Sequence, residues 1–162
     1  MNNNFIFRKA KIQDLKDVLR LNLELFKKEY REFDKTLDLN WTFAGGAKFF
    51  KNEIIKNYAF VELVEKNKRP VGYLSGHLKK AIPYHKKAKY AELGSIFVAK
   101  RFRNMGLGKR LVVDFIKWCN KNKVDYIGVA SSAKNELAHK FYRNSKFKDY
   151  DLVLQLKLSK NK

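Results

Sequence analysis

Arg103-Asn104-Met105-Gly106-Leu107-Gly108 is the stretch of this sequence that decides the fold. Residues 90–99, which lie shortly before it, are rich in apolar, β-branched and aromatic side chains and predict a strand. Apolar residues then recur at every fourth position and predict an amphipathic helix: Leu107, Leu111, Phe115 and Cys119. A glycine turn before a helix lets backbone N–H groups approach an anion closely, and the helix dipole favours the same negative charge. The sequence therefore predicts a pyrophosphate site at residues 103–108.

The glycine spacing distinguishes this loop from two other phosphate-binding patterns. A dinucleotide fold requires G-x-G-x-x-G and an ATPase-type loop requires G-x-x-x-x-G-K-[ST], and the sequence has neither. Its pattern, [Q/R]-x-x-G-x-[G/A], resembles the pyrophosphate loop of the GNAT superfamily, the acetyl-CoA-dependent N-acetyltransferases. Downstream, a short strand is predicted at 124–130, and residues 135–142 are similar to the family's N-x-x-A-x-x-F/L-Y helix, with Phe147 following. The alternative is an ordinary strand–turn–helix unit in which glycine only starts the helix.

The predicted elements follow the order strand, two helices, three strands, helix, strand, helix, strand. The strands are expected at 5–8, 58–64, 71–77, 90–99, 124–130 and 152–158, and the helices at 14–30, 47–56, from 107 onward and at 135–142. Together with the resemblance, this order implies an α/β fold with a GNAT-like mixed, largely antiparallel central sheet, splayed at strand 90–99, and helices on both faces. A length of 162 residues with 45% hydrophobic content suits one domain over residues 1–162.

Composition limits the classes of protein to which the chain can belong. No apolar run approaches the ~20 residues of a membrane span, and Met1-Asn2-Asn3-Asn4 lacks signal-peptide character. The single Cys119 excludes an internal disulfide, and its place on the apolar helical face favours a core role. With only three histidines, no metal-ligand cluster is expected. These features indicate a soluble, cytoplasmic protein without a bound metal.

The formal net charge of +20 is unevenly distributed. Residues 1–58 carry 12 Lys and Arg against 8 Asp and Glu, a net charge of +4, whereas residues 59–162 carry 24 against 8, a net of +16. The half with the predicted phosphate loop is thus the basic half, and its field would attract polyanionic coenzyme A. The lysines between 79 and 89 are interpreted as a solvated loop, because no recognition helix or RNA-binding motif supports a nucleic-acid partner.

The resemblance to GNAT enzymes implies the residues of an acetyl-CoA site. Family members hold the pantetheine against backbone groups of the splayed strand and stabilise the oxyanion with one of its N–H groups, here that of Val98. A tyrosine in the last helix, here Tyr142, reprotonates the departing thiolate. Asn135 matches a residue that contacts the coenzyme arm, although asparagine also caps helices. The implied coenzyme contacts are Ile96, Phe97, Val98, Arg103, Asn104, Met105, Gly106, Leu107, Gly108, Lys109, Asn135 and Tyr142.

Glu92 is the candidate general base. It precedes Gly106 by 14 residues, the separation at which histone-type acetyltransferases place their glutamate base. On a regular strand it would share a face with Gly94 and Ile96 and could point into the splayed cleft. Partial burial would then raise its pKa. The alternative is a strand-end glutamate paired with Lys89 or another lysine.

Two departures from the family pattern bear on the acceptor side. Lys146 stands where a glycine is common, so another residue is expected to take the left-handed conformation that ends the last helix. The segment after Phe147 is short, which leaves part of the acceptor wall missing or supplied by a second subunit of a homodimer. The prediction is an N-acetyltransferase acting on a primary amine of a small molecule or peptide. A coenzyme A sensor without transferase activity, and a basic module that binds an acidic protein or nucleic acid, are the alternatives.

Overall fold

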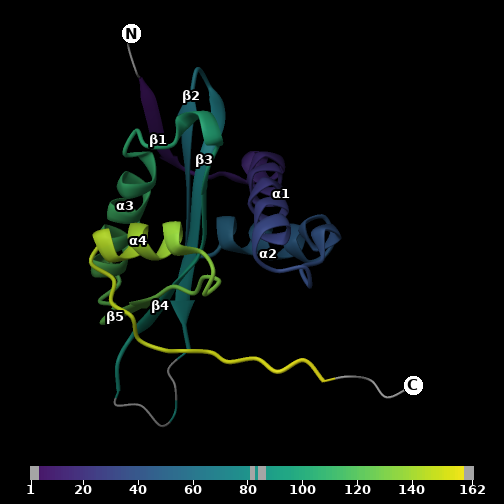
Figure 1. Cartoon of the computed structure of the whole chain (residues 1–162). Coiled ribbons are helices and arrows are strands. Elements are labelled where there is room, and N and C mark those ends of the chain that lie inside the picture. Colours follow the sequence, from purple (N-terminus) through teal and green to yellow (C-terminus); the bar gives the residue numbers. More distant parts are fainter. Residues whose placement is uncertain (1–3, 81–82, 84–86, 159–162) are drawn as a thin grey trace.

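The computed structural model describes residues 4–80, 83 and 87–158. Its sheet has five strands in the order β1-β2-β3-β4-β5, antiparallel except for the parallel pair β4–β5. Helices α1 and α2 lie on one face, and α3 and α4 on the other (Figure 1). The strands are β1 Phe5–Lys9, β2 Ala59–Lys66, β3 Arg69–Lys79, β4 Tyr90–Val98 and β5 Tyr126–Gly128; the α-helices are α1 Leu15–Glu32, α2 Gly45–Ile55, α3 Leu107–Lys121 and α4 Glu136–Asn144; short 3-10 turns span Ile12–Asp14, Leu39–Thr42 and Lys100–Phe102.

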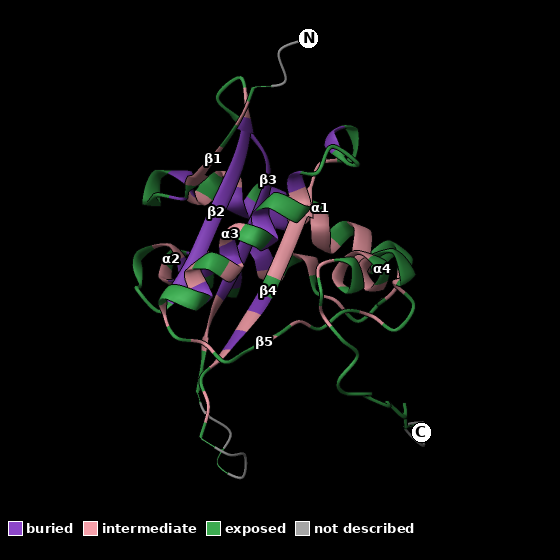
Figure 2. Ribbon diagram, turned by 90° about the vertical axis from the view of Figure 1, so that its left-hand side faces the viewer, coloured by how far each residue is buried: buried purple, intermediate pink, exposed green. Residues whose placement is uncertain are grey.

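Each face of the sheet has its own apolar core. On the α3 face, the four residues predicted from the fourfold spacing are all buried, with Leu111 and Phe115 fully inaccessible. The opposite core is formed by α1 and α2 with β2 and β3, and includes Val18, Phe50 and Tyr73. Full burial of such a side chain contributes about 1.5–3 kcal/mol. Figure 2 shows the result: the central strands are buried along most of their length, and exposure is concentrated on the outer sides of the helices.

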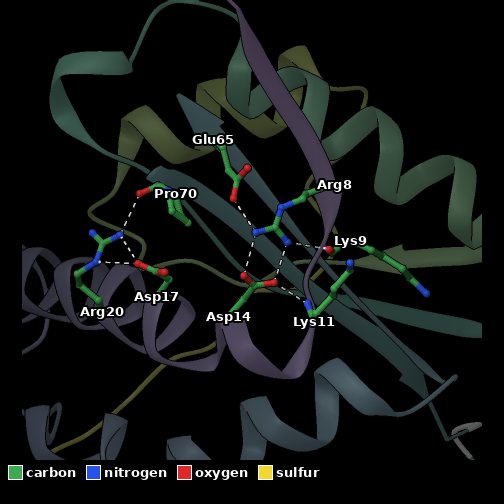
Figure 3. A network of polar contacts seen from close by, with 8 residues as sticks. All are labelled: Arg8, Lys9, Lys11, Asp14, Asp17, Arg20, Glu65 and Pro70. Carbon is green, nitrogen blue, oxygen red and sulfur yellow. Dashed lines mark hydrogen bonds and ion pairs between the residues drawn. The ribbon is translucent and has the colours of Figure 1, made fainter. Parts of the chain in front are cut away.

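A polar network fixes the start of α1 to the sheet (Figure 3). The Arg8 guanidinium, on β1, donates to both carboxylate oxygens of Asp14 at 2.7 and 2.8 Å and to Glu65 of β2 at 2.6 Å. Asp14 also accepts the backbone N–H of Lys11 at 2.7 Å. The hydrogen bonds from Arg8 hold the pKa of Asp14 below its usual range. This network joins β1, β2 and the first turn of α1, and so fixes the direction in which α1 crosses the sheet.

The β2–β3 hairpin is tighter than the sequence suggests. The strands predicted at 58–64 and 71–77 leave six residues between them, but only Asn67 and Lys68 lie outside the strands of the structure. Both have positive φ, 51° and 62°, the conformation of a two-residue type I′ turn. Arg69 and Pro70 join β3, which lengthens both strands. The helix predicted at residues 47–56 begins two residues earlier, because Gly45 and Gly46 are the first two residues of α2.

The strand predicted at 152–158 is wrong. These residues form no strand, and Figure 1 shows them running away from the body of the protein as an extended segment. Their apolar side chains are 77–87% exposed: Leu152, Val153, Leu154, Leu156 and Leu158. Alternating apolar residues give strand propensity, but a strand also needs a neighbour to bond with. In the described chain this segment has none.

The end of α4 also differs from expectation. Lys146 itself adopts the left-handed conformation, with φ 72°, so no other residue replaces the glycine common at this position. The lysine-rich segment expected to be a solvated loop lies partly outside the described residues. In the described part of the chain, no helix combines the length and the apolar character needed to cross a membrane.

Candidate active site

The sheet opens between β4 and β5. β5 pairs with β4 only at Tyr90, Ala91 and Glu92, and Glu92 is matched with Gly128. From Leu93 to Val98, β4 keeps its partner β3 but has no described strand on its other side. Because backbone groups of a strand alternate between its two edges, about half of those in this segment face the gap. The gap has its vertex at Glu92 and provides backbone donors and acceptors along one wall.

A β-bulge lies at this vertex. Leu93 pairs with Gly76 and Ser95 pairs with Ser75, so Gly94 has no opposite residue on β3. The extra residue reverses the alternation of side chains along β4. Glu92 therefore shares a face with Phe97, on the α1–α2 side, while Ile96 packs on the α3 side. This corrects the expectation that Glu92 and Ile96 share a face, which assumed a regular strand.

The predicted phosphate loop ends at an uncapped helix N-terminus. Gly106 is the N-cap of α3, with φ 77°, and no side chain caps the helix. The N–H of Arg110 is the first to bond back, to the Gly106 carbonyl at 3.0 Å, so the N–H groups of residues 107–109 have no acceptor within the helix. A Cβ built on Gly106 would meet no atom within 4 Å. Open space, free donors and the positive end of the helix dipole make this turn suitable for an anion.

Some side chains of the loop are exposed to solvent, and others pack against the rest of the protein. Arg103 folds back, and its Nε donates to the Val98 carbonyl at 2.9 Å, which ties the loop to the end of β4. Asn104, Met105 and Lys109 are exposed, and Leu107 is buried in the core. A Cβ on Gly108 would lie 3.3 Å from the Phe141 ring and 4.0 Å from Ile96 Cδ1. Gly108 therefore marks where α3, α4 and β4 meet.

Helix α4 presents Asn135 and Tyr142 on this side of the sheet. The Asn135 side chain accepts the N–H of Ala138 at 3.1 Å, so it caps the helix. Tyr142 is half-buried, with its ring 5.3 Å from that of Phe141 and 5.7 Å from that of Phe147. Burial raises the pKa of Tyr142 to about 12, and the carboxylate of Glu29 on α1 adds to the effect. The phenol therefore keeps its proton at neutral pH.

Glu92 is held by a lysine. Its carboxylate lies 2.7 Å from Lys79 Nζ and is about one-third exposed. Lys89, the partner named from the sequence, instead donates to the Asn122 carbonyl at 2.9 Å. The ion pair agrees with the alternative interpretation of Glu92 as a paired strand-end residue, and Glu92 also lies at the vertex of the gap.

Sequence reasoning missed a second polar cluster on the same face as Glu92. Glu53 of α2 is almost completely buried and accepts a hydrogen bond from Ser75 Oγ at 3.0 Å. The same carboxylate oxygen lies 3.4 Å from Nδ1 of His77, which stands opposite Glu92 on β3. The only signal in the sequence was the alternation of Tyr73, Ser75 and His77, which places three polar side chains on one face of a strand.

Comparison with known proteins identifies the family. The acetyltransferase (GNAT) family profile matches residues 15–147. The chain belongs to this family. An uncharacterized N-acetyltransferase of Methanocaldococcus jannaschii is 29% identical over 138 residues, which are 85% of this chain and 60% of that protein. The match therefore spans less than two-thirds of the relative's length.

Solved structures confirm the GNAT fold of the chain. A mutant of the BH1408 protein from Bacillus halodurans has a TM-score of 0.79 at 20% identity, covering 95% of this chain and 99% of the other. The aminoglycoside N-acetyltransferase AAC(6')-Iy in complex with CoA has a TM-score of 0.74 at 14% identity, with 96% and 95% covered. At these identities the likeness establishes the mixed, splayed sheet with helices on both faces, and leaves the substrate open.

Most of the predicted site residues are gathered around one gap. The loop, the end of β4 and α4 meet at Gly108, and Glu92 closes the gap at its vertex. The residues fit a polyanionic coenzyme, because the Gly106 turn leaves space and unbonded N–H groups beside the exposed Lys109. Among the described residues, no group of His, Cys, Asp and Glu side chains is arranged to hold a metal ion.

Proposed function

We propose that this protein is an acetyl-CoA-dependent N-acetyltransferase that transfers the acetyl group to a primary amine by direct attack on the thioester. The single observation that carries the proposal is the uncapped α3 N-terminus at Gly106, placed beside the gap between β4 and β5 in a GNAT chain. The loop and the exposed Lys109 would hold the pyrophosphate, and Asn135 would contact the coenzyme arm. Backbone groups of Ile96, Phe97 and Val98 would hold the pantetheine.

Tyr142 is proposed to protonate the departing thiolate. A general acid must carry its proton at the working pH, and the pKa of about 12 meets this condition. Its ring lies on α4, which packs through Phe141 against the start of α3, and so belongs to the same region as the coenzyme loop. The N–H of Val98 is proposed to stabilise the oxyanion, since β4 has no strand partner on the gap side at this point.

Glu92 is proposed to act on the acceptor amine. Its carboxylate lies at the vertex of the gap on the α1–α2 face, opposite to the face on which Ile96 and Val98 pack. An amine that is protonated in water would be attracted to this carboxylate, and the sequence-based hypothesis gives it the role of base acting through water. The ion pair with Lys79 would then have to open, or be replaced by the ammonium of the acceptor.

Two measurements test this proposal in sequence. A thermal shift with acetyl-CoA should raise the melting temperature, because a ligand that binds only the folded state stabilises it. Thiol release should then be followed with a panel of amines: a monoamine, a polyamine, an aminoglycoside, a lysine peptide and a peptide with a free N-terminus. Stabilisation without thiol release from any amine would favour a coenzyme A sensor. Absence of both effects would refute the acetyltransferase assignment and favour a basic binding module.

We further propose that two copies of the chain associate through residues 152–158. Five apolar side chains in this segment are exposed, and the outer edge of β5 has no partner among the described strands. An alternating apolar segment and an unpaired edge are complementary when they come from two chains. Pairing would extend the sheet next to the gap and supply part of the acceptor wall.

The variant Leu154→Lys tests this association, with Gln155→Lys as the matched control. Both add one positive charge to the same segment, but alternation places Leu154 and Gln155 on opposite faces of an extended chain. Light scattering after size exclusion should give a dimer for the wild type and for Gln155→Lys, and a monomer for Leu154→Lys. A monomeric wild type over the micromolar range would refute the proposed dimer.

A further inference from the structure

A buried carboxylate, a histidine and a second carboxylate lie together on the acceptor side of the sheet. Glu53 comes from α2, His77 from β3 and Glu92 from β4. The 3.4 Å between His77 Nδ1 and Glu53 Oε2 is long for a hydrogen bond, and Nδ1 has no hydrogen-bond partner of good geometry although it is buried. The contact is therefore an ion pair whenever the imidazole is charged.

The arrangement leaves Nε2 as the ring nitrogen of His77 that could accept a proton. Nδ1 is buried against Glu53, yet a quarter of the His77 side chain is exposed. Nε2, on the opposite side of the ring, is not among the buried side-chain atoms that lack a partner, and we take the exposed part of the side chain to include it. The Phe49 ring meets the imidazole edge-on, with centroids 6.3 Å apart, and limits its movement. A histidine oriented by a carboxylate at Nδ1, with Nε2 free, is arranged to accept a proton at Nε2.

The cluster lies next to the place where the acceptor must react. His77 is directly opposite Glu92 in the β3–β4 register, so the two side chains share a face. Glu92 is the last residue of β4 that pairs with β5, so the gap begins beside it. Neighbouring side chains across an antiparallel pair have Cβ atoms about 5 Å apart. A group bound at the vertex could therefore touch both.

We propose that His77 takes the proton of the acceptor ammonium, with Glu53 positioning it and Glu92 attracting the ammonium. The inference rests on the proposed acetyltransferase function. It assigns to His77 and Glu92 together the role on the acceptor amine that the sequence-based hypothesis assigned to Glu92 alone. The proton moves from the ammonium nitrogen to His77 Nε2, and the free amine attacks the carbonyl carbon. The C–S bond breaks, Tyr142 protonates the thiolate and is reprotonated by the proton lost from the new amide nitrogen. His77 then releases its proton to water.

The charges that face His77 set the pH range in which it works. Glu53 of α2 has the largest influence and raises the pKa of His77, burial opposes it, and Glu92 of β4 adds to the rise. Lys79, on the same strand, lowers it, while the β2 residue opposite His77 is the uncharged Ala59. His77 accepts a proton only when neutral. Activity should therefore rise with pH along a limb whose midpoint lies above the ordinary histidine value of about 6.5.

The test compares kcat/KM against pH for the wild type, His77→Gln, Glu53→Gln and Glu92→Gln, on an amine from the panel. We expect His77→Gln to lose the limb and about 10²- to 10⁴-fold in rate near neutrality, with acetyl-CoA affinity unchanged. Glu53→Gln should move the limb to lower pH, since it removes the main cause of the raised pKa. Glu92→Gln should raise KM for the amine and keep the limb.

Glu65→Gln is the matched control, since Glu65 is another buried carboxylate, paired with Arg8, and should leave the limb in place. Histidine Cε1–H resonances give a readout without turnover: the His77 titration midpoint should fall in Glu53→Gln and should stay unchanged in Glu65→Gln. A wild type without activity on any amine overturns the proposed function and this inference with it. An active wild type whose limb is kept in His77→Gln, or is lost only in Glu92→Gln, overturns the inference alone.

Discussion

Replacing Gly106 with valine is the most direct test of the coenzyme loop. Gly106 has φ 77°, where an L-residue costs about 1–2 kcal/mol and a β-branched one lies at the upper end. For a chain of this length, each kcal/mol lowers the melting temperature by about 2–4 °C. The Cβ meets no protein atom within 4 Å, so no packing penalty is added. The variant should therefore fold, with a melting temperature lower by about 2–8 °C.

The effect on coenzyme binding should be much larger than the effect on stability. The new side chain would stand in the space beside the free N–H groups of residues 107–109 and keep the pyrophosphate away from them. A hydrogen bond to a charged group contributes about 1.5–3 kcal/mol, so losing two costs about 3–6 kcal/mol. This corresponds to a loss of affinity of about 10²- to 10⁴-fold.

Calorimetric titration of coenzyme A into the folded variant measures this loss. Val18→Ala is the control, because Val18 is fully buried in the α1–α2 core and its truncation costs about 2 kcal/mol without touching the loop. The control should bind coenzyme A like the wild type. An unchanged dissociation constant in folded Gly106→Val would refute the assignment of the loop.

Three further predictions concern single side chains. Tyr142→Phe should lower kcat by at least about tenfold with little change in coenzyme affinity, because it removes a proton donor that is needed only as the thiolate forms. Equal kcat values for the variant and the wild type, under conditions where the chemical step limits the rate, would contradict this. Lys79→Met should lower KM for the amine, because the ion pair between Lys79 and Glu92 would no longer compete with the acceptor ammonium. An unchanged or higher KM would argue against binding of the acceptor amine by Glu92. Burial raises the pKa of the Glu62 carboxyl from 4.5 to about 7. The folded state therefore binds this proton more tightly than the unfolded state does. The resulting stabilisation of the fold is complete below pH 4.5 and is lost as the pH rises through 7. Glu62→Gln should therefore be more stable than the wild type at pH 8.5 by up to about 3 kcal/mol and differ little at pH 4.5, as urea unfolding at both pH values would show.

The strand–loop–helix unit could be predicted because its signals are local. The apolar residues at every fourth position from Leu107 onward predict a helix with one face against a core, and all four of them are buried. The turn at Gly106 needs only a residue that tolerates positive φ. Signals of this kind lie within a few residues of one another and do not depend on the rest of the chain.

The features that were missed depend on contacts between distant residues. Glu53 and His77 are brought together by the packing of α2 on β3, and the alternation around His77 indicates only the face of its strand, not the contact with Glu53. The alternation at 152–158 was visible, but the existence of a neighbouring strand is not a property of the segment itself. The bulge at Gly94 is a register change between two strands, and a single glycine within a strand is only a weak sign of it.

That bulge has a consequence for how two substrates could meet. In a regular strand, Glu92 and Ile96 would lie on the same face, and the acceptor would have to share it with the side chains that pack towards α3. The extra residue puts Glu92 on the face of His77 and Glu53, while Ile96 and Val98 stay with the α3 core. The groups proposed to accept the proton then lie on the α1–α2 side, and the helix start proposed to bind the pyrophosphate lies on the other side. An amine entering from the α1–α2 side would meet a thioester held along the β4 backbone at the one place where the sheet is open.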